Sequence, residues 1–252
     1  MKTCDLTEYL DDYLEIKKIP DSSQNGLQVE GKSEVESIGV AVDACLDSIQ
    51  AAAEAGVDLL IVHHGLFWER VEKLVGSHYQ RVKALLEGEI NLYCAHLPLD
   101  AHLEVGNNAV LARKLGFRPI SGFGPADSGP VSIGCLAAID SPISQVELFD
   151  RLVSNLGDEF RADFFGPSSI QSLAVLTGGG ASFIPLAHSR RVDAYLTGEP
   201  KHSFYHFSKE NNVNVIYGGH YETETFGVIA LGEHLQRIHD LPFQFFHFPT
   251  GL

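Results

Sequence analysis

The chain of 252 residues repeats one strand–helix pattern twice, and this repeat limits the possible folds more than any other feature. In each half, short runs of apolar and often branched side chains alternate with stretches that have helical spacing. The runs fall at 37–42, 56–64 and 90–94, and again at 173–176, 191–199 and 213–217. Strands that alternate with helices in this way are typical of α/β proteins. The sequence therefore predicts an α/β fold of two similar domains related by an internal duplication.

A segment rich in glycine, proline, serine and aspartate, 121–130, predicts the boundary between the two domains. The first domain would comprise residues 1–125 and the second residues 126–252, with the C-terminal segment packing back on the first. The histidines and acids of interest divide between them: His63, His64 and Asp100 in the first, His220 and Glu224 in the second.

Two adjacent histidines, His63 and His64, end the strand predicted at 56–64, and Gly65 follows them. In open α/β sheets, ligands bind beyond the carboxyl ends of the strands. Neighbours at a strand end point to opposite faces, so this pair would serve two centres more naturally than one. A lone histidine there would more often be a packed side chain, whereas two adjacent ones favour metal ligation.

The third predicted strand of each half leads into a histidine followed four residues later by an acid. These pairs are His96 with Asp100 and His220 with Glu224. Duplicated domains would point such strand ends at a shared cleft, with Glu199 and Glu222 close by. Unrelated surface pairs are the simpler explanation for any one pair, but the symmetric set favours a site.

This set of histidines and acids exceeds the three or four ligands that one zinc-like ion needs. It suits two divalent ions about 3.5–4 Å apart that share a bridging carboxylate, and we expect Glu224 to be that bridge. Mixed imidazole and carboxylate ligands favour Zn, Fe, Mn, Co or Ni over Ca or Mg. The prediction is a dinuclear metal site in the cleft between the two domains.

The composition excludes several classes of partner. A net charge of −15, from 18 basic and 33 acidic residues, argues against a nucleic acid or an anionic membrane surface. No apolar run approaches membrane-spanning length and the N-terminus lacks an apolar signal core, so we expect a cytoplasmic protein. The four cysteines are far apart, which is typical of reduced thiols.

The segment 177–182, of sequence TGGGAS, joins a predicted strand to a predicted helix. Backbone N–H groups at such a turn can hold a phosphate. A tight turn without a ligand is an equally good interpretation, because the segment has neither a G-x-G-x-x-G pattern nor a Walker lysine.

Five segments together resemble a known family. They are NGLQVEG at 25–31, IVHHGLFW at 61–68, HLPLDAH at 96–102, TGGG at 177–180, and Gly219-His220 with Glu224. In this order, over nearly the whole chain, they resemble the GTP cyclohydrolase I type 2 homologue family in its short bacterial form. This family is also called NGG-one-interacting-factor-three-like. The resemblance implies two α/β domains, a toroidal homohexamer and a dinuclear metal site that faces its interior cavity.

The resemblance also implies a specific ligand set: His63, His64, Asp100, His220 and Glu224. One ion would be held by His63, Asp100 and Glu224. The other would be held by His64, His220 and Glu224. His96 falls outside this set, so we expect it beside the ligands rather than on a metal ion. Glu222 or Glu199 would carry protons.

The implied function is that of a metal-dependent hydrolase acting on a nucleotide-like small molecule, and the family name implies ring opening of GTP. The alternative is a non-enzymatic, metal-binding hexamer that serves as a regulator or an interaction platform. Open coordination positions on the ions would favour the enzyme, and ions saturated by protein ligands would favour the alternative.

Overall fold

The computed structural model describes residues 1–124 and 132–252, which form two compact units. Unit 1 comprises Met1–Leu99 with Gly227–Phe248, and unit 2 comprises Asp100–Phe226 with Pro249–Leu252. The boundary that the sequence predicts, between residues 125 and 126, lies outside the described residues. Asp100, which the sequence assigns to the first domain, begins unit 2.

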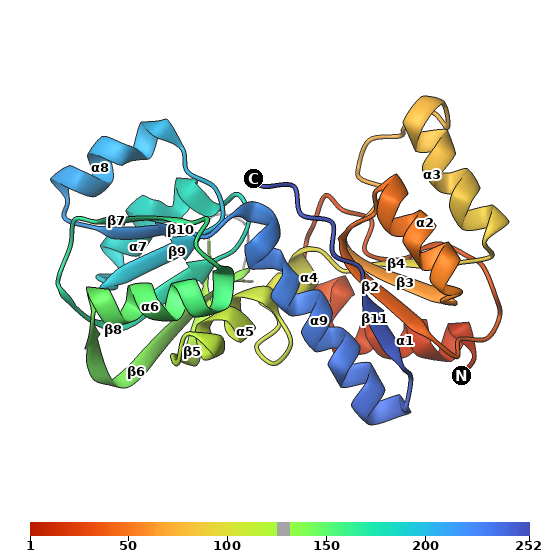
Figure 1. Ribbon diagram of the computed structural model, residues 1–252, viewed down its shortest axis with the longest axis horizontal. Helices are drawn as coiled ribbons and strands as arrows, with labels where there is room; N and C mark the ends of the chain where they lie inside the picture. Colours follow the sequence, from red (N-terminus) through yellow and green to blue (C-terminus); the bar gives the residue numbers. More distant parts are fainter. Residues whose placement is uncertain (125–131) are drawn as a thin grey trace. The chain divides into compact units, whose positions relative to one another are not determined.

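Unit 1 is built on a five-stranded sheet in the order β1-β4-β3-β2-β11, which Figure 1 colours from orange to yellow apart from a blue β11. Strands β2, β3, β4 and β11 are parallel, and β1 is antiparallel to β4. The strands are β1 (Gly26–Val29), β2 (Ile38–Asp43), β3 (Leu59–His64), β4 (Asn91–Cys94) and β11 (Phe243–Phe245). The helical elements are α1 (Thr3–Tyr13), η1 (Ile16–Lys18), α2 (Leu46–Ala55), α3 (Gly76–Glu87) and most of α9 (His220–His239).

Strand β3 lies in the middle of this sheet, as its unbroken apolar run predicts. The side chains from Leu59 to His63 are fully buried. Gly56 ends the preceding helix α2 in the left-handed conformation, with φ of 71°, where glycine has no steric penalty. A rigid, buried strand therefore carries His63 and His64 to one edge of the sheet.

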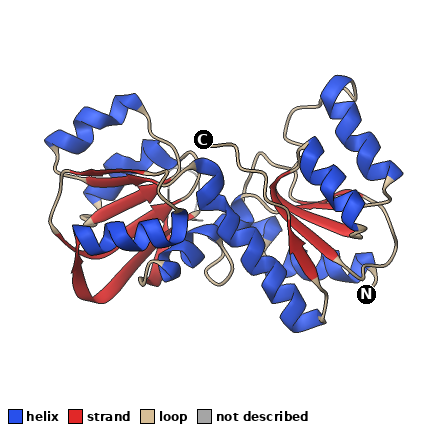
Figure 2. Ribbon diagram, viewed as in Figure 1, coloured by secondary structure: helices blue, strands red, loops and turns tan. Residues whose placement is uncertain are grey.

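Unit 2 is built on a six-stranded sheet in the order β5-β6-β8-β9-β10-β7, and Figure 2 shows its strands in red between blue helices. Its strands are β5 (Arg118–Phe123), β6 (Gly134–Ser144), β7 (Arg161–Phe164), β8 (Ser169–Leu176), β9 (Ala194–Thr197) and β10 (Asn214–Tyr217). The helical elements are α5 (Asn107–Lys114), α6 (Gln145–Leu156), η2 (Gly180–Phe183), α7 (Ile184–Ser189), η3 (His202–Phe204) and α8 (Tyr205–Glu210). The short helix α4 (Leu97–Ala101) leads into this unit and α9 begins in it.

The two sheets share a four-stranded core with the same register, which agrees with the predicted duplication. Leu59 of β3 pairs with Asn91 of β4, and Ala194 of β9 pairs with Asn214 of β10. Strands β2 and β8 flank the central strand in matching register, and an antiparallel strand, β1 or β7, completes each core. The order β1-β4-β3-β2 thus corresponds to β7-β10-β9-β8.

The predicted match between His96 and His220 is off by one residue. Counted from the paired asparagines, Leu97 and His220 occupy the same position, and each begins a helix. His96 lies before its helix and therefore corresponds to Gly219. The two His-x-x-x-acid patterns have the same internal spacing, so the sequence alone aligned them by their histidines rather than by the helix starts.

Two prolines lie in elements other than those that their sequence context favours. The pair Ser141-Pro142 predicts a helix start, because proline suits the first helical position, but β6 continues to Ser144 and α6 begins at Gln145. The hydroxyl of Ser144 accepts a hydrogen bond from the N–H of Glu147 at 3.1 Å and caps α6. Pro98 predicts a break in regular structure, because proline disrupts the interior of helices and strands, but it lies in the first turn of α4, where no backbone N–H is needed.

Other element ends differ from the sequence prediction. The apolar spacing at the N-terminus predicts a first helix over residues 3–17, but α1 ends at Tyr13. Asp43 is a residue type that suits a helix cap, but α2 begins at Leu46 with Cys45 as its cap. Strands β5 and β7 were missed, because neither has a continuous apolar run. The apolar run from Val131 to Ile139 predicts a strand; β6 begins at Gly134 in the described residues, and Val131 itself lies outside them.

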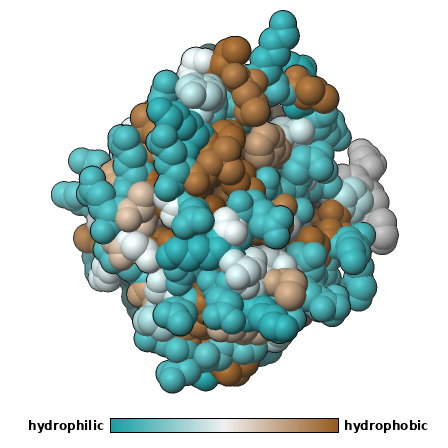
Figure 3. Space-filling view, turned by 90° about the vertical axis from the view of Figure 1, so that its right-hand side faces the viewer, coloured by the Kyte–Doolittle hydropathy of each residue, from teal (hydrophilic) through white to brown (hydrophobic). Residues whose placement is uncertain are grey.

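The face that includes α3 is mostly hydrophilic, with groups of apolar residues on it (Figure 3). The exposed apolar side chains of α3 and of the segment before it are Val71, Leu74, Val75, Tyr79 and Leu86. Within residues 1–124 and 132–252, no helix is both long enough and apolar enough for a membrane span. These side chains are a surface feature of unit 1 and include no predicted site residue.

Candidate metal centre

Three histidines gather at the carboxyl edge of the unit 1 sheet. Strand β3 ends with His63 and His64, and β4 leads to His96. The ring centroids of His63 and His64 lie 4.7 Å apart, and those of His63 and His96 lie 5.0 Å apart. One ring nitrogen from each lies within 4.8 Å of the others, so this group could hold a metal ion.

Hydrogen bonds fix the rings of His63 and His64 in one tautomer. The Nδ1 of His63 lies 2.9 Å from the carbonyl oxygen of Ala95, and the Nδ1 of His64 lies 2.8 Å from Oδ1 of Asp43. A carbonyl or carboxylate oxygen only accepts a hydrogen bond, so each Nδ1 carries the proton. In the neutral ring the lone pair is then on Nε2, which is how metal-binding histidines are usually prepared.

His96 has the same arrangement, with Asp21 as its partner. Its Nδ1 lies 3.0 Å from both carboxylate oxygens of Asp21. Burial raises the pKa of Asp21, but hydrogen bonds and the charge of His96, with donors from Ser23 and Asn25, outweigh it and lower the pKa to about 2. The structure therefore places His96 among the histidines of unit 1 and orients it as it orients the two expected ligands.

In unit 2, His220 and Glu224 lie one turn apart at the start of α9. The Nε2 of His220 is 3.2 Å from Oε2 of Glu224, and its Nδ1 is 2.5 Å from Oε1 of Glu199. The hydrogen bond with Glu224 raises the pKa of His220, burial lowers it, and Glu199 raises it further, to about 9. At neutral pH the metal-free ring is thus an imidazolium between two carboxylates.

Asp100 is held at the end of β8 by two asparagines that the sequence analysis did not select for the site. Its Oδ1 accepts from Nδ2 of Asn107 at 2.9 Å and from Oγ1 of Thr177 at 3.4 Å. Asn108 donates to the carbonyl of Asp100 at 3.0 Å and accepts from the N–H of Thr177 at 2.8 Å. Both asparagines are buried, and they fix Asp100 against β8.

The two acids expected to carry protons lie in different environments. Glu199 binds the ring of His220, which gives it a positioning role for that side chain. Glu222 lies in the first turn of α9 with its carboxylate folded over Gly219, where a Cβ would come well under 3.0 Å from Oε2. An acid in this turn also stabilises the helix through its dipole.

Sequence reasoning missed Asp21 and Asp43, which orient His96 and His64. Asp43 was predicted as a helix cap and Asp21 as a turn residue. The signal was present for Asp43, because it ends β2 and pairs in register with His64 at the end of β3. No local pattern connects Asp21 with His96, which is 75 residues away.

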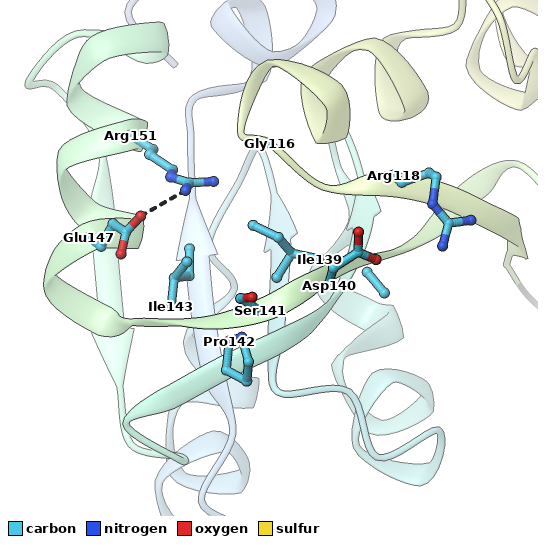
Figure 4. A pocket seen from close by; sticks show the side chains of 10 residues that line it. Gly116, Arg118, Ile139, Asp140, Ser141, Pro142, Ile143, Glu147 and Arg151 are labelled. Atoms are coloured by element: carbon cyan, nitrogen blue, oxygen red, sulfur yellow. Dashed lines mark hydrogen bonds and ion pairs between the residues drawn. The ribbon is translucent and has the colours of Figure 1, made fainter.

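A concavity of about 510 Å³ lies in unit 2 beside β6 and α6 (Figure 4). Arg118, Asp140, Glu147 and Arg151 line it. Arg151 donates to Glu147 and to the carbonyl of Leu115, both at 2.7 Å. None of the predicted site residues lines this concavity, so the candidate chemistry belongs to the strand ends described above.

Comparison with known proteins decides the family. The family model described as Duf34/NIF3 (NGG1p interacting factor 3) matches residues 1–250. The chain belongs to this family. The resemblance inferred from the five sequence segments is thereby confirmed.

Similar family members include proteins named as cyclohydrolase homologues and solved structures. A Deinococcus radiodurans protein named GTP cyclohydrolase 1 type 2 homolog is 43% identical over 248 residues, which are 98% of this chain and 94% of that protein. TTHA1606 from Thermus thermophilus is 43% identical, with a TM-score of 0.88 and full coverage of both chains. The protein ybgI, described as of unknown function, is 36% identical, with a TM-score of 0.92 and full coverage of both chains. The two-sheet α/β fold is therefore shared with solved relatives.

Proposed function

We propose that this Duf34/NIF3 family member is a metal-dependent hydrolase that acts on a nucleotide-like small molecule. The observation that supports it most is the orientation of the histidines. Each of His63, His64, His96 and His220 directs Nδ1 at an oxygen atom, so a metal ion would bind through Nε2. Four rings held by Nδ1 in this way suit metal binding better than ordinary packing does, once His220 has lost its Nε2 proton.

The proposed ligands are His63, His64, Asp100, His220 and Glu224. Such imidazole and carboxylate donors suit a divalent transition metal such as Zn, Fe, Mn, Co or Ni. Two ions per chain, with Glu224 shared between them, is the proposed stoichiometry. Bound ions would supply Lewis acidity toward a water molecule and a substrate oxygen.

The other side chains would hold the ligands or move protons. Asp43 and Glu199 accept hydrogen bonds from Nδ1 of His64 and His220, so they fix the ring orientation and make Nε2 a better metal ligand. The ring of His220 must lose its Nε2 proton before that atom can bind a cation. Glu222 is the proposed proton carrier, since its carboxylate lies over Gly219, next to His220 in the chain.

The names of the relatives, rather than the geometry, support the proposed substrate class. Several proteins 36–43% identical to this chain are named GTP cyclohydrolase 1 type 2 homolog, which supports a nucleotide-like substrate. The net charge of −15 disfavours a nucleic acid.

The homohexamer stays a prediction, which native mass spectrometry would measure.

The test combines metal content with a nucleotide panel on the same sample. We expect about two transition-metal ions per chain by elemental analysis after loading, and hydrolysis of at least one nucleotide. Formate among the products would indicate opening of the guanine ring, and phosphate would indicate phosphohydrolysis. Glu224→Ala should lose metal and turnover together, because it removes the shared carboxylate.

The matched control is His188→Ala, which removes an exposed histidine of α7 and should keep both properties. Retained metal and activity in Glu224→Ala would contradict the proposed site. Two ions per chain with no turnover across the panel would instead favour the non-enzymatic, metal-binding assembly.

A further inference from the structure

Gly178 lies just beyond the end of β8 and adopts φ of +63°. In the duplicated sheets it corresponds to Asp43, because β2 and β8 pair in matching register with β3 and β9. In unit 1, the Asp43 side chain holds the ring of His64. Unit 2 has no side chain at the corresponding place.

In unit 2, the carboxylate of Glu224, a candidate metal ligand on α9, fills that place. A Cβ built on Gly178 would come far under 3.0 Å from Oε1 of Glu224 and 3.1 Å from Nε2 of His220. Real Cβ atoms essentially never approach a heavy atom so closely, so the Glu224 carboxylate would have to shift. Glu224 is only 3% exposed, which leaves its side chain little room to do so.

The backbone of Gly178 is fixed as well. Its carbonyl oxygen accepts from the N–H groups of Gly180 at 3.0 Å, Gly198 at 2.9 Å and Glu199 at 3.0 Å. Its own N–H donates to Oγ1 of Thr223 at 3.2 Å. Moving this backbone to accept a side chain would break hydrogen bonds to the segment after β9 and to α9, so the carboxylate would move instead.

We propose that Gly178 is a positioning residue: the absence of its side chain lets the Glu224 carboxylate lie against the end of β8, beside the ring of His220. The role of Gly178 in metal binding rests on the proposed function, but the close approach of Gly178 and the Glu224 carboxylate is independent of any metal. The glycine-rich turn at 177–182 thereby has a steric role, which Gly178 performs.

The first experiment measures the affinity of the whole protein for Zn²⁺ alone, by calorimetry, in Gly178→Ala and in two glycine controls. Gly56→Ala introduces a side chain at a similarly positive φ, +71°, with nothing within 4 Å. Gly179→Ala tests the neighbouring position, with φ of −81° and also nothing within 4 Å. We expect Gly178→Ala to lose at least about 10-fold in affinity, the scale for residues that orient ligands, and the controls to match the wild type. Equal affinity in Gly178→Ala and the wild type would overturn the proposal.

The second experiment is a double-mutant cycle on the metal-free protein, read as the melting temperature. Gly178→Ala should lower it more than Gly56→Ala does, and the excess should disappear in a Glu224→Ala background, where no carboxylate opposes the new methyl group. An excess that persists in that background would overturn the proposal.

The cycle also separates the two hypotheses. A wild-type protein that binds no Zn²⁺ would contradict the proposed function, while the cycle would still decide the role of Gly178. If Gly178→Ala alone does not fold, recovery of folding in the double variant supports the steric role, and failure of both variants contradicts it.

Discussion

The two sheets have the same polar groups at the amino ends of their strands and different ones at the carboxyl ends. At the amino ends of the strands, Asn91 in unit 1 and Asn214 in unit 2 each bind two carbonyls and one N–H of neighbouring segments. Asp58 and Asp193 likewise accept from backbone N–H groups before β2 and within β8. These hydrogen bonds connect neighbouring segments at the amino ends of the strands, and both units of the duplicated fold have them.

At the carboxyl ends, corresponding positions carry different chemistry. Asp43 and His64 in unit 1 correspond to Gly178 and Glu199 in unit 2. In unit 1 a carboxylate on β2 holds a histidine on β3, whereas in unit 2 the acid after β9 holds His220 on α9. The same scaffold therefore presents a His–carboxylate pair in each unit, with the two partners on different elements.

The largest expected effect tests whether Asn91 and Asn214, at the amino ends of their strands, contribute equally to the free energy of unfolding. Asn91→Ala and Asn214→Ala should each lower the free energy of unfolding by about 2–4 kcal/mol, since each leaves several buried backbone groups without a partner. Denaturant unfolding of the metal-free protein measures this. Asn155→Ala, at a half-buried position on α6, should cost much less, and a large difference between the two buried variants would break the equivalence.

A smaller effect is expected at the carboxyl edge. Asp43→Ala and Glu199→Ala should each weaken metal affinity by about 10–100-fold, because each removes the acceptor that orients a histidine ring. Zn²⁺ titration calorimetry measures the change, with Glu54→Ala, an exposed acid on α2, as the control. If only one of the two variants loses affinity, the His–carboxylate pairs do not have equal roles.

The smallest effect concerns the pH dependence of stability. It tests the pair of His220 and Glu224 in unit 2. In the metal-free protein the pKa of His220 is raised from 6.5 to about 9, first by the hydrogen bond to Glu224. A raised pKa means that folding takes up a proton between these values. The stabilisation is therefore complete below about pH 6.5 and is lost as the pH rises through about 9.

Unfolding free energies measured across this pH window should fall in the wild type and fall less in Glu224→Gln, which lacks the charge. An NMR titration of the His220 ring should give the same result, with a pKa nearer the ordinary value in the variant. An unchanged pKa in Glu224→Gln would show that Glu224 does not hold the imidazolium.

Local sequence patterns predicted the central strands and the ends that carry the histidines. The apolar run before His63 and His64, and the glycine that ends α2, were placed correctly because strand burial and left-handed helix ends depend on neighbouring residues. Element starts near Pro98 and Pro142 were placed wrongly, since proline is compatible with a strand, a turn or the first helical turn.

Local patterns along the chain were enough to predict the α/β class, the duplication, the family and a set of histidines and acids at strand ends. Which acid holds which ring became visible only in the fold: Asp43 with His64, Asp21 with His96 and Glu199 with His220. The closeness of Gly178 to the carboxylate of Glu224 likewise depends on the fold. Hydrophobic periodicity is a local property that the chain displays directly, whereas a hydrogen bond near 3 Å depends on how strands far apart in sequence are paired.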